Sequence, residues 1–173
     1  MIQLAYQAAY DPYHTAFRML RIEEAAPRQF ILKIDHLRIV DFYLAFPHFI
    51  KNIRFSPRER GYIKKHSLGA FLPPYGDIPP ASVLFRNMQP IQEAAIHTLV
   101  LQGFFAIEDF KDGYIRKTEK DVPGDLKKVV AKRNNEQKNL MEFFQNYLLD
   151  IKFEGMGGLK DRTGLMEFKY DFV

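Results

Sequence analysis

The feature that most constrains this chain is the absence of cysteine from its 173 residues. Without a thiol, the chain cannot form a disulfide scaffold, a cysteine-ligated zinc site, an iron–sulfur cluster or a thiol nucleophile. Its stability must come from packing, and a chain of this length with 47% hydrophobic residues can bury a sizeable core by itself. We therefore expect residues 1–173 to form a single domain that needs no cofactor.

Local signals in the first half of the sequence predict helices. Asp-Pro at 11–12 suits a helix start, because Asp can accept from free amides and Pro fits the first helical position. Residues 31–46 are apolar nearly all round and predict a core helix. The sequence SPRE at 56–59 is a capping box, with Pro at the first helical position, and predicts a short basic helix over about 57–66.

The second half changes its period. Residues 69–80 are rich in proline and glycine and predict a loop, while 90–118 predict a helix followed at once by a β-hairpin at about 104–118, turning at Asp112-Gly113. A long helix is expected over 125–150, and a turn with a final strand over 151–173. The predicted fold class is therefore α+β and mostly helical, with a winged-helix-like core and a long C-terminal helix.

Basic residues are concentrated in two segments. The net charge is +4, but residues 51–66 carry six Lys/Arg against one carboxylate, and residues 111–138 carry nine against five. Such clusters are typical of phosphate contacts, and solvated faces or acidic partner subunits are the alternatives. The candidate DNA-phosphate contacts are Arg54, Arg58, Arg60, Lys64, Lys65, Arg116, Lys117, Lys128, Lys132 and Arg133.

No catalytic constellation is recognisable in the sequence. The five histidines show no i, i+4 metal-binding pair, and the glycines at 155–158 lack the lysine and hydroxyl residue of a phosphate loop. We interpret the pairs Asp35 with Asp41 and Glu23 with Glu24 as charges on helix surfaces. These observations predict a protein that is not an enzyme and binds no metal. A site built on Tyr13 and His14 is the weakest alternative.

Two segments near the N-terminus carry a resemblance to a known family. The chain resembles the small middle component of bacterial ABC-three-component systems, the group that includes Lamassu-type antiphage defence. The resemblance covers about the first fifty residues. The residues that carry it are Tyr10-Asp11-Pro12-Tyr13-His14, Phe17, Leu20, Arg21, the run LRIVDFY at 37–43, and Phe46-Pro47.

The resemblance implies a role in a complex. Such a subunit would join an SMC-like ABC ATPase to an effector, often a nuclease, and would meet double-stranded DNA through the complex. It supplies no catalytic residues. We expect the apolar partner interface to comprise Phe71, Leu72, Tyr75, Ile78, Phe143 and Tyr147.

No apolar run approaches the length of a membrane span, so we expect a cytoplasmic protein without membrane contact. The competing interpretation is a free-standing winged-helix DNA-binding regulator. Its recognition helix would be 90–102. This helix contains no Arg or Lys, the side chains that most often contact guanine and phosphate, so it is poorly suited to bind DNA.

Overall fold

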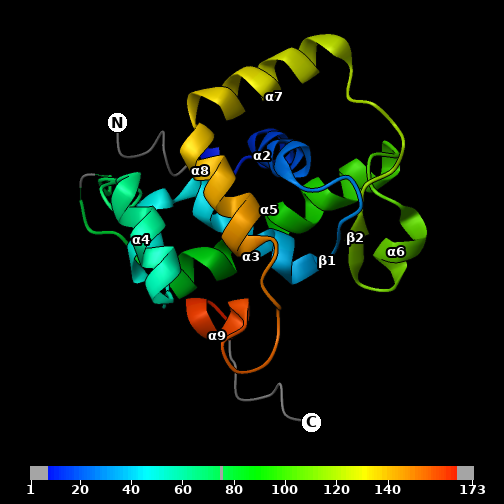
Figure 1. Cartoon of the computed structure of the whole chain (residues 1–173). Helices are drawn as coiled ribbons and strands as arrows, with labels where there is room; N and C mark the ends of the chain where they lie inside the picture. Colours follow the sequence, from blue (N-terminus) through cyan, green and yellow to red (C-terminus); the bar gives the residue numbers. More distant parts are fainter. Residues whose placement is uncertain (1–7, 75, 167–173) are drawn as a thin grey trace.

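The computed structural model describes residues 8–74 and 76–166, which are mostly helical with one two-stranded antiparallel sheet (Figure 1). The elements in chain order are α2 (Pro12–Ala25), β1 (Ile31–Lys33), α3 (Ile34–Ala45), the 3-10 helix η1 (Pro47–Asn52), α4 (Pro57–Lys65), α5 (Ala81–Leu101), α6 (Ile107–Lys111), β2 (Tyr114–Arg116), α7 (Gly124–Glu136), α8 (Lys138–Phe143), the π-helix η2 (Phe144–Leu148) and α9 (Leu159–Thr163).

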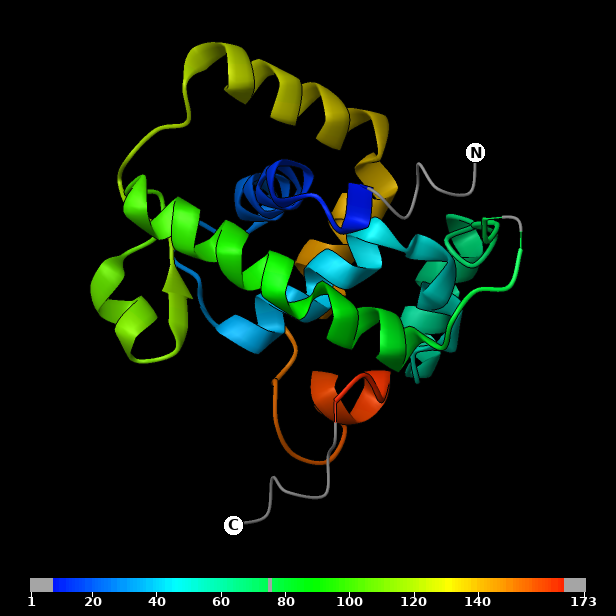
Figure 2. The same cartoon turned by 180° about the vertical axis from the view of Figure 1, so that it is seen from behind.

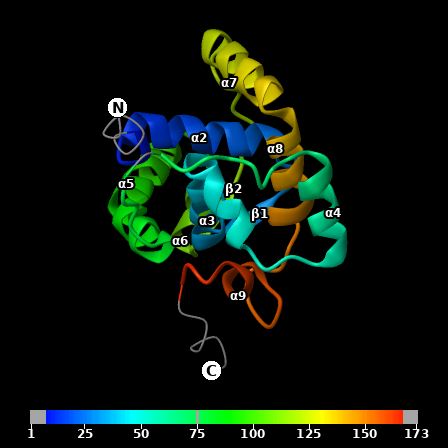
Figure 3. The same ribbon diagram turned by 90° about the vertical axis from the view of Figure 1, so that its left-hand side faces the viewer.

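Helix α2 is the hub of the fold. It packs against α5, α3, α7 and α8, and Figure 2 shows it between α7 on one side and α5 with α3 on the other. Its Met19 and Ile22 are fully buried, as are Ile39 and Phe42 of α3, so these two helices contribute the centre of the hydrophobic core. Helix α9 and the segment before it lie at the opposite end of the molecule from α7 (Figure 3).

The predicted helix starts are confirmed. The Asp11 side chain accepts from the amide of His14 at 2.9 Å, and Pro12 opens α2. Ser56 and Glu59 form both halves of the capping box before α4. Local signals of this kind are reliable because both partners lie within one turn of the chain.

The hairpin predicted at 104–118 forms only in part: its second strand is β2, and Phe105 makes a single antiparallel bridge with Lys117. The winged-helix-like core is not confirmed. Residues 107–111 form α6 instead of a strand, and Gly113 (φ +86°) ends that helix. Asp112 has φ −87°, whereas the predicted type I′ turn needs a positive φ there. Strand β2 pairs antiparallel with β1, with Leu32 opposite Ile115 and both side chains buried. The alternating apolar pattern reflected packing of a short helix against α5.

Two other boundaries differ from prediction. Residues 31–33, which were assigned to the core helix, form β1 instead. No local pattern indicated this strand, because its partner β2 lies far along the chain. Helix α5 starts at Ala81 and continues through Pro90, which was expected to open a helix. Buried Leu84, Phe85 and Met88 anchor the turns before the proline, so the helix continues despite the lost amide.

The long helix predicted over 125–150 is interrupted. Gln137 (φ −116°, ψ 36°) ends α7, and the chain continues as α8 and the π-helix η2. Residues beyond Leu148 form turns and then α9, and most of the final strand predicted within 151–173 lies outside the described residues. Across 8–74 and 76–166, no helix combines the length and apolarity required to cross a bilayer.

Candidate functional site: a buried polar network and exposed basic surfaces

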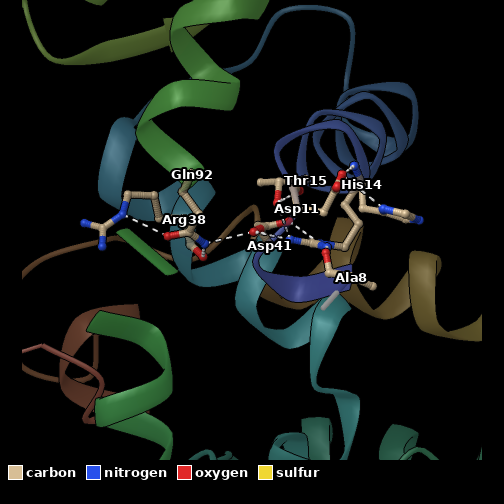
Figure 4. Close-up of polar contacts among 8 residues, drawn as sticks. Ala8, Asp11, His14, Thr15, Arg38, Asp41 and Gln92 are labelled. Atoms are coloured by element: carbon tan, nitrogen blue, oxygen red, sulfur yellow. Dashed lines mark hydrogen bonds and ion pairs between the residues drawn. The ribbon is translucent and has the colours of Figure 1, made fainter. Parts of the chain in front are cut away.

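A buried ion pair joins the two segments that carry the family resemblance. Arg18 of α2 donates through Nε to Asp41 Oδ1 at 2.6 Å and through Nη2 to Asp41 Oδ2 at 3.1 Å, and the carboxylate is 0% exposed. Gln92 of α5 also donates to Asp41 Oδ2 at 2.8 Å (Figure 4). Asp41 is therefore not the surface charge that we expected. It joins three helices in the core.

The network continues along α3. Arg38 Nε donates to Gln92 Oε1 and Gln92 Nε2 donates back to the Arg38 carbonyl, both at 3.0 Å. The Arg38 guanidinium also pairs with Asp35 and lies 4.7 Å from the centre of the Phe85 ring. Each of these side chains therefore has a partner, and a satisfied buried network of this kind rigidifies a core and fixes one packing arrangement.

The motif residues at 10–14 build the start of α2. Asp11 caps the helix and contacts His14 Nδ1 at 3.1 Å, while the Thr15 hydroxyl donates to the Asp11 carbonyl at 2.8 Å. Thr15 in turn accepts from Arg18, so the cap continues into the ion pair. Tyr13 is 86% exposed. These contacts explain the motif by helix capping and positioning of Arg18.

Two further charges of α2 are buried, and sequence patterns gave no sign of them. Arg21 donates to the amide oxygens of Asn134 and Gln137 at 2.9 and 2.7 Å, and burial lowers the pKa of Arg21 to about 10, so it remains charged at neutral pH. Glu23 pairs with Lys117 at 2.9 Å and is also buried, which corrects its assignment as a surface charge. Through its hydrogen bonds to Asn134 and Gln137, Arg21 holds the junction between α7 and α8 against α2.

The basic residues around α4 lie on two different faces. Arg60 and Lys64, spaced i, i+4, line a hollow of about 610 Å³ together with Lys51 and Arg54. Its apolar lining consists of Ile53, Phe55 and Ile63. Arg58 and Lys65 lie on the side of Tyr62, whose hydroxyl donates to Glu142 of α8 at 3.2 Å.

The predicted phosphate contacts divide by their partners. Four of them form ion pairs within the chain, namely Arg54 with Asp161, Arg116 with Asp109, Lys117 with Glu23 and Arg133 with Glu136. The other six have no ion pair with any described residue, and they are Arg58, Arg60, Lys64, Lys65, Lys128 and Lys132. Lys128 and Lys132 project from α7, which lies at the top of Figure 1, whereas α4 lies at the left. The two basic segments therefore form separate surfaces.

The predicted apolar interface is only partly exposed. Leu72 is 87% exposed, whereas Phe71 and Ile78 are half-buried against the core, and Tyr75 lies outside the described residues. Phe143 is 0% exposed and contacts the rings of Phe55 and Tyr62, so its assignment as an interface residue is wrong. Tyr147 is half-buried beside the Phe143 and Tyr62 rings.

The other buried titratable side chains among the described residues include two histidines and Tyr43. His36 Nε2 donates to the Leu148 carbonyl at 2.6 Å, and burial lowers its pKa. Burial and the nearby Lys51 charge lower the pKa of His48, whose Nε2 is buried without a hydrogen-bond partner. In the described part of the chain, no three His, Asp or Glu side chains come together as a metal site would require.

The fold and these surfaces define a small, mostly helical protein with a buried network of paired charges and two exposed basic surfaces. Residues 4–171 match the family model of the ABC-three component (ABC-3C) system Middle Component 5, and the chain belongs to this family. This confirms the resemblance to middle components and extends it over almost the whole chain. No curated protein and no solved structure gives a significant match. Membership indicates an adaptor role and interaction with the other components of such a system.

Proposed function

We propose that this protein is the non-catalytic adaptor that links an SMC-like ABC ATPase to an effector, such as a nuclease, in a bacterial antiphage or anti-plasmid defence complex of the Lamassu type. The observation that carries the proposal is the family match over residues 4–171. The described surface supports it, because Leu72 presents an almost fully exposed apolar side chain on the Pro-rich loop, and such side chains are common at interface centres.

Co-purification tests the adaptor role. The chain is co-expressed with the ATPase and effector encoded by the adjacent genes, and a tagged copy is expected to retain both. Leu72→Asp is expected to release at least one component, because a charge on a buried interface contact opposes association. Leu101→Asp is the matched control, since Leu101 is 70% exposed at the end of α5. A wild-type chain that elutes alone in the presence of both proteins would refute the adaptor role.

A second part of the proposal concerns DNA. Lys128 and Lys132 are exposed on α7, have no ion pair with a described residue and lie one turn apart. We propose that they, with Arg58 and Lys65 of α4, contact the phosphates of double-stranded DNA within the complex. Contacts of this kind are independent of sequence and sensitive to salt.

The salt dependence of binding tests this contact. Reversing both lysines (Lys128→Glu with Lys132→Glu) is expected to reduce the slope of log affinity against log salt by about 2, because each lost phosphate contact removes about 0.9. The charge-matched control is Arg28→Glu with Arg86→Glu, two exposed positions outside α4 and α7. An unchanged slope would assign the α7 lysines to solubility or to protein contacts.

The free-standing DNA-binding regulator is no longer supported. Its wing required the hairpin at 104–118, where the chain forms α6 and a strand paired with β1. Sequence-specific binding of duplex DNA by the isolated chain at physiological salt would restore that interpretation.

A further inference from the structure

The hollow beside α4 combines a basic rim with an apolar floor. Four cations line it, Lys51, Arg54, Arg60 and Lys64, and no carboxylate of the described residues does. Of these, Arg54 is paired with Asp161, while the other three have no ion pair with any described residue. Between the cations lie Ile53, which is buried, and Phe55 and Ile63, which are half-buried.

This arrangement is unfavourable without a ligand. Arg60 and Lys64 stand one turn apart on α4, a spacing at which like charges repel. The hollow also leaves apolar surface of Phe55 and Ile63 in contact with water. A ligand that brings negative charge to the rim and an apolar group to the floor relieves both.

We propose that this hollow is the docking site for an acidic segment of a partner protein, and that this segment inserts one large apolar side chain between the cations. The proposal rests on the adaptor function and names the chemistry of one of its contacts. Carboxylates of the segment pair with Lys51, Arg60 and Lys64, and its apolar side chain contacts Phe55 and Ile63. The volume of about 610 Å³ accommodates a large side chain with its neighbouring backbone.

Duplex DNA fits this site less well. Phosphate oxygens gain nothing from an apolar floor, and the backbone of a duplex is convex and fully hydrated. In addition, the wall of the hollow, Gly69 and Ala70, leads within two residues to Leu72, which is 87% exposed. Apolar surface that continues from a charged hollow into an exposed loop favours a protein partner.

The backbone beside the hollow has a defined conformation that is stabilised by hydrogen bonds. Ser67 lines it with φ 54°, a left-handed conformation that glycine usually occupies, and the Leu68 amide donates to the Ile63 carbonyl at 3.0 Å. These two features end α4 in a Schellman motif. The rim residues on α4 and the wall at 67–70 are thus held together before any ligand binds.

Fluorescence anisotropy with a model probe tests the site. The probe is a short fluorescein-labelled peptide of alternating Asp and Glu with one central Phe, and its partner probe carries Ser in place of Phe. The full chain is expected to bind the Phe peptide. Arg60→Glu with Lys64→Glu weakens this binding about tenfold, because two exposed ion pairs with the peptide are lost.

The control variant is Arg28→Glu with Arg86→Glu, which makes the same change in charge outside the hollow. It is expected to bind the Phe peptide within about twofold of wild type, since distant exposed charges are largely screened. The Ser peptide is expected to bind at least about fivefold more weakly, which corresponds to the loss of one buried apolar group. Melting followed by circular dichroism establishes that both variants are folded.

Several outcomes overturn the proposal. One is the absence of measurable binding of the Phe peptide. Another is equal binding of the Phe and Ser peptides, or an equal loss of peptide affinity in the hollow variant and the control variant, since either result shows general charge attraction. A third is loss of duplex DNA binding by the Arg60→Glu, Lys64→Glu variant with peptide binding intact, which assigns these cations to DNA. Co-purification separates this inference from the proposed function. If the variant still retains both components, the docking site is refuted while the adaptor role stands.

Discussion

Replacing Asp41 with Asn tests the role of the buried ion pair between α2 and α3. The substitution keeps the shape of the side chain but removes its charge. Asp41 accepts two hydrogen bonds from Arg18 and one from Gln92, and it is fully buried. Removing one member of a buried pair leaves an uncompensated charge, and we expect the free energy of unfolding to fall by about 3–5 kcal/mol.

The geometry allows no simple compensation. The amide nitrogen that replaces a carboxylate oxygen is a donor, so it must face the Arg18 guanidinium or the donating Gln92 amide. In a chain of this size, each kcal/mol shifts the melting temperature by about 2–4 °C, so a decrease of about 6–20 °C is expected. Urea unfolding and thermal melting measure both quantities.

A double-mutant cycle measures how much the interaction between Arg18 and Asp41 contributes to stability beyond the effects of the two single substitutions. Arg18→Met with Asp41→Leu removes both charges and is expected to recover most of the lost stability, because apolar side chains replace a buried pair at little net cost. Asp150→Asn changes an exposed carboxylate and is expected to stay within about 0.5 kcal/mol of wild type. A loss below about 1 kcal/mol for Asp41→Asn would refute the argument.

Three further substitutions have defined expectations. Ser56→Ala removes half of the capping box and should lower the free energy of unfolding by about 1 kcal/mol in urea titrations, with no change contradicting the cap. The lowered pKa of buried His48 means that the unfolded chain takes up its proton first, so stability is full above about pH 6.5 and falls as pH decreases toward the folded-state pKa. His48→Leu should flatten this fall between about pH 7 and 5, and an unchanged slope in pH-dependent melting would refute it. Arg21→Met should speed hydrogen exchange of the α7 amides about tenfold while those of α5 keep their rates, and equal rates in α7 would contradict its anchoring by Asn134 and Gln137.

Residues 104–118 show why the first strand of the predicted hairpin was misassigned, whereas its second strand contains β2. The alternation of Phe105, Ile107 and Asp109 has the period of a strand, but five residues are too few to distinguish a strand from a short helix. The true partner of β2 is β1, more than eighty residues earlier. No local pattern encodes a pairing across that separation, so the sequence alone could not indicate it.

The candidate surfaces illustrate the same limit. Arg60 and Lys64 were predicted to act with Arg58 and Lys65 as one patch, yet they project to different sides of α4. Phe143 was assigned to an interface because exposed Phe and Tyr side chains are common there, but α8 packs into the core and buries its ring. Exposure is a property of the packed helices, so composition could only propose candidates.

By itself, the sequence determined the helix starts at Pro12 and Pro57, the need for a packed core without thiols and the resemblance to middle components. Each depends on residues within a few positions of one another or on composition. Only the tertiary structure decided that Asp41 and Glu23 are buried, and that four cations surround one apolar hollow. Their partners come from helices and loops far apart in the chain, and burial, which sets the strength of a charge interaction, exists only once those elements have packed.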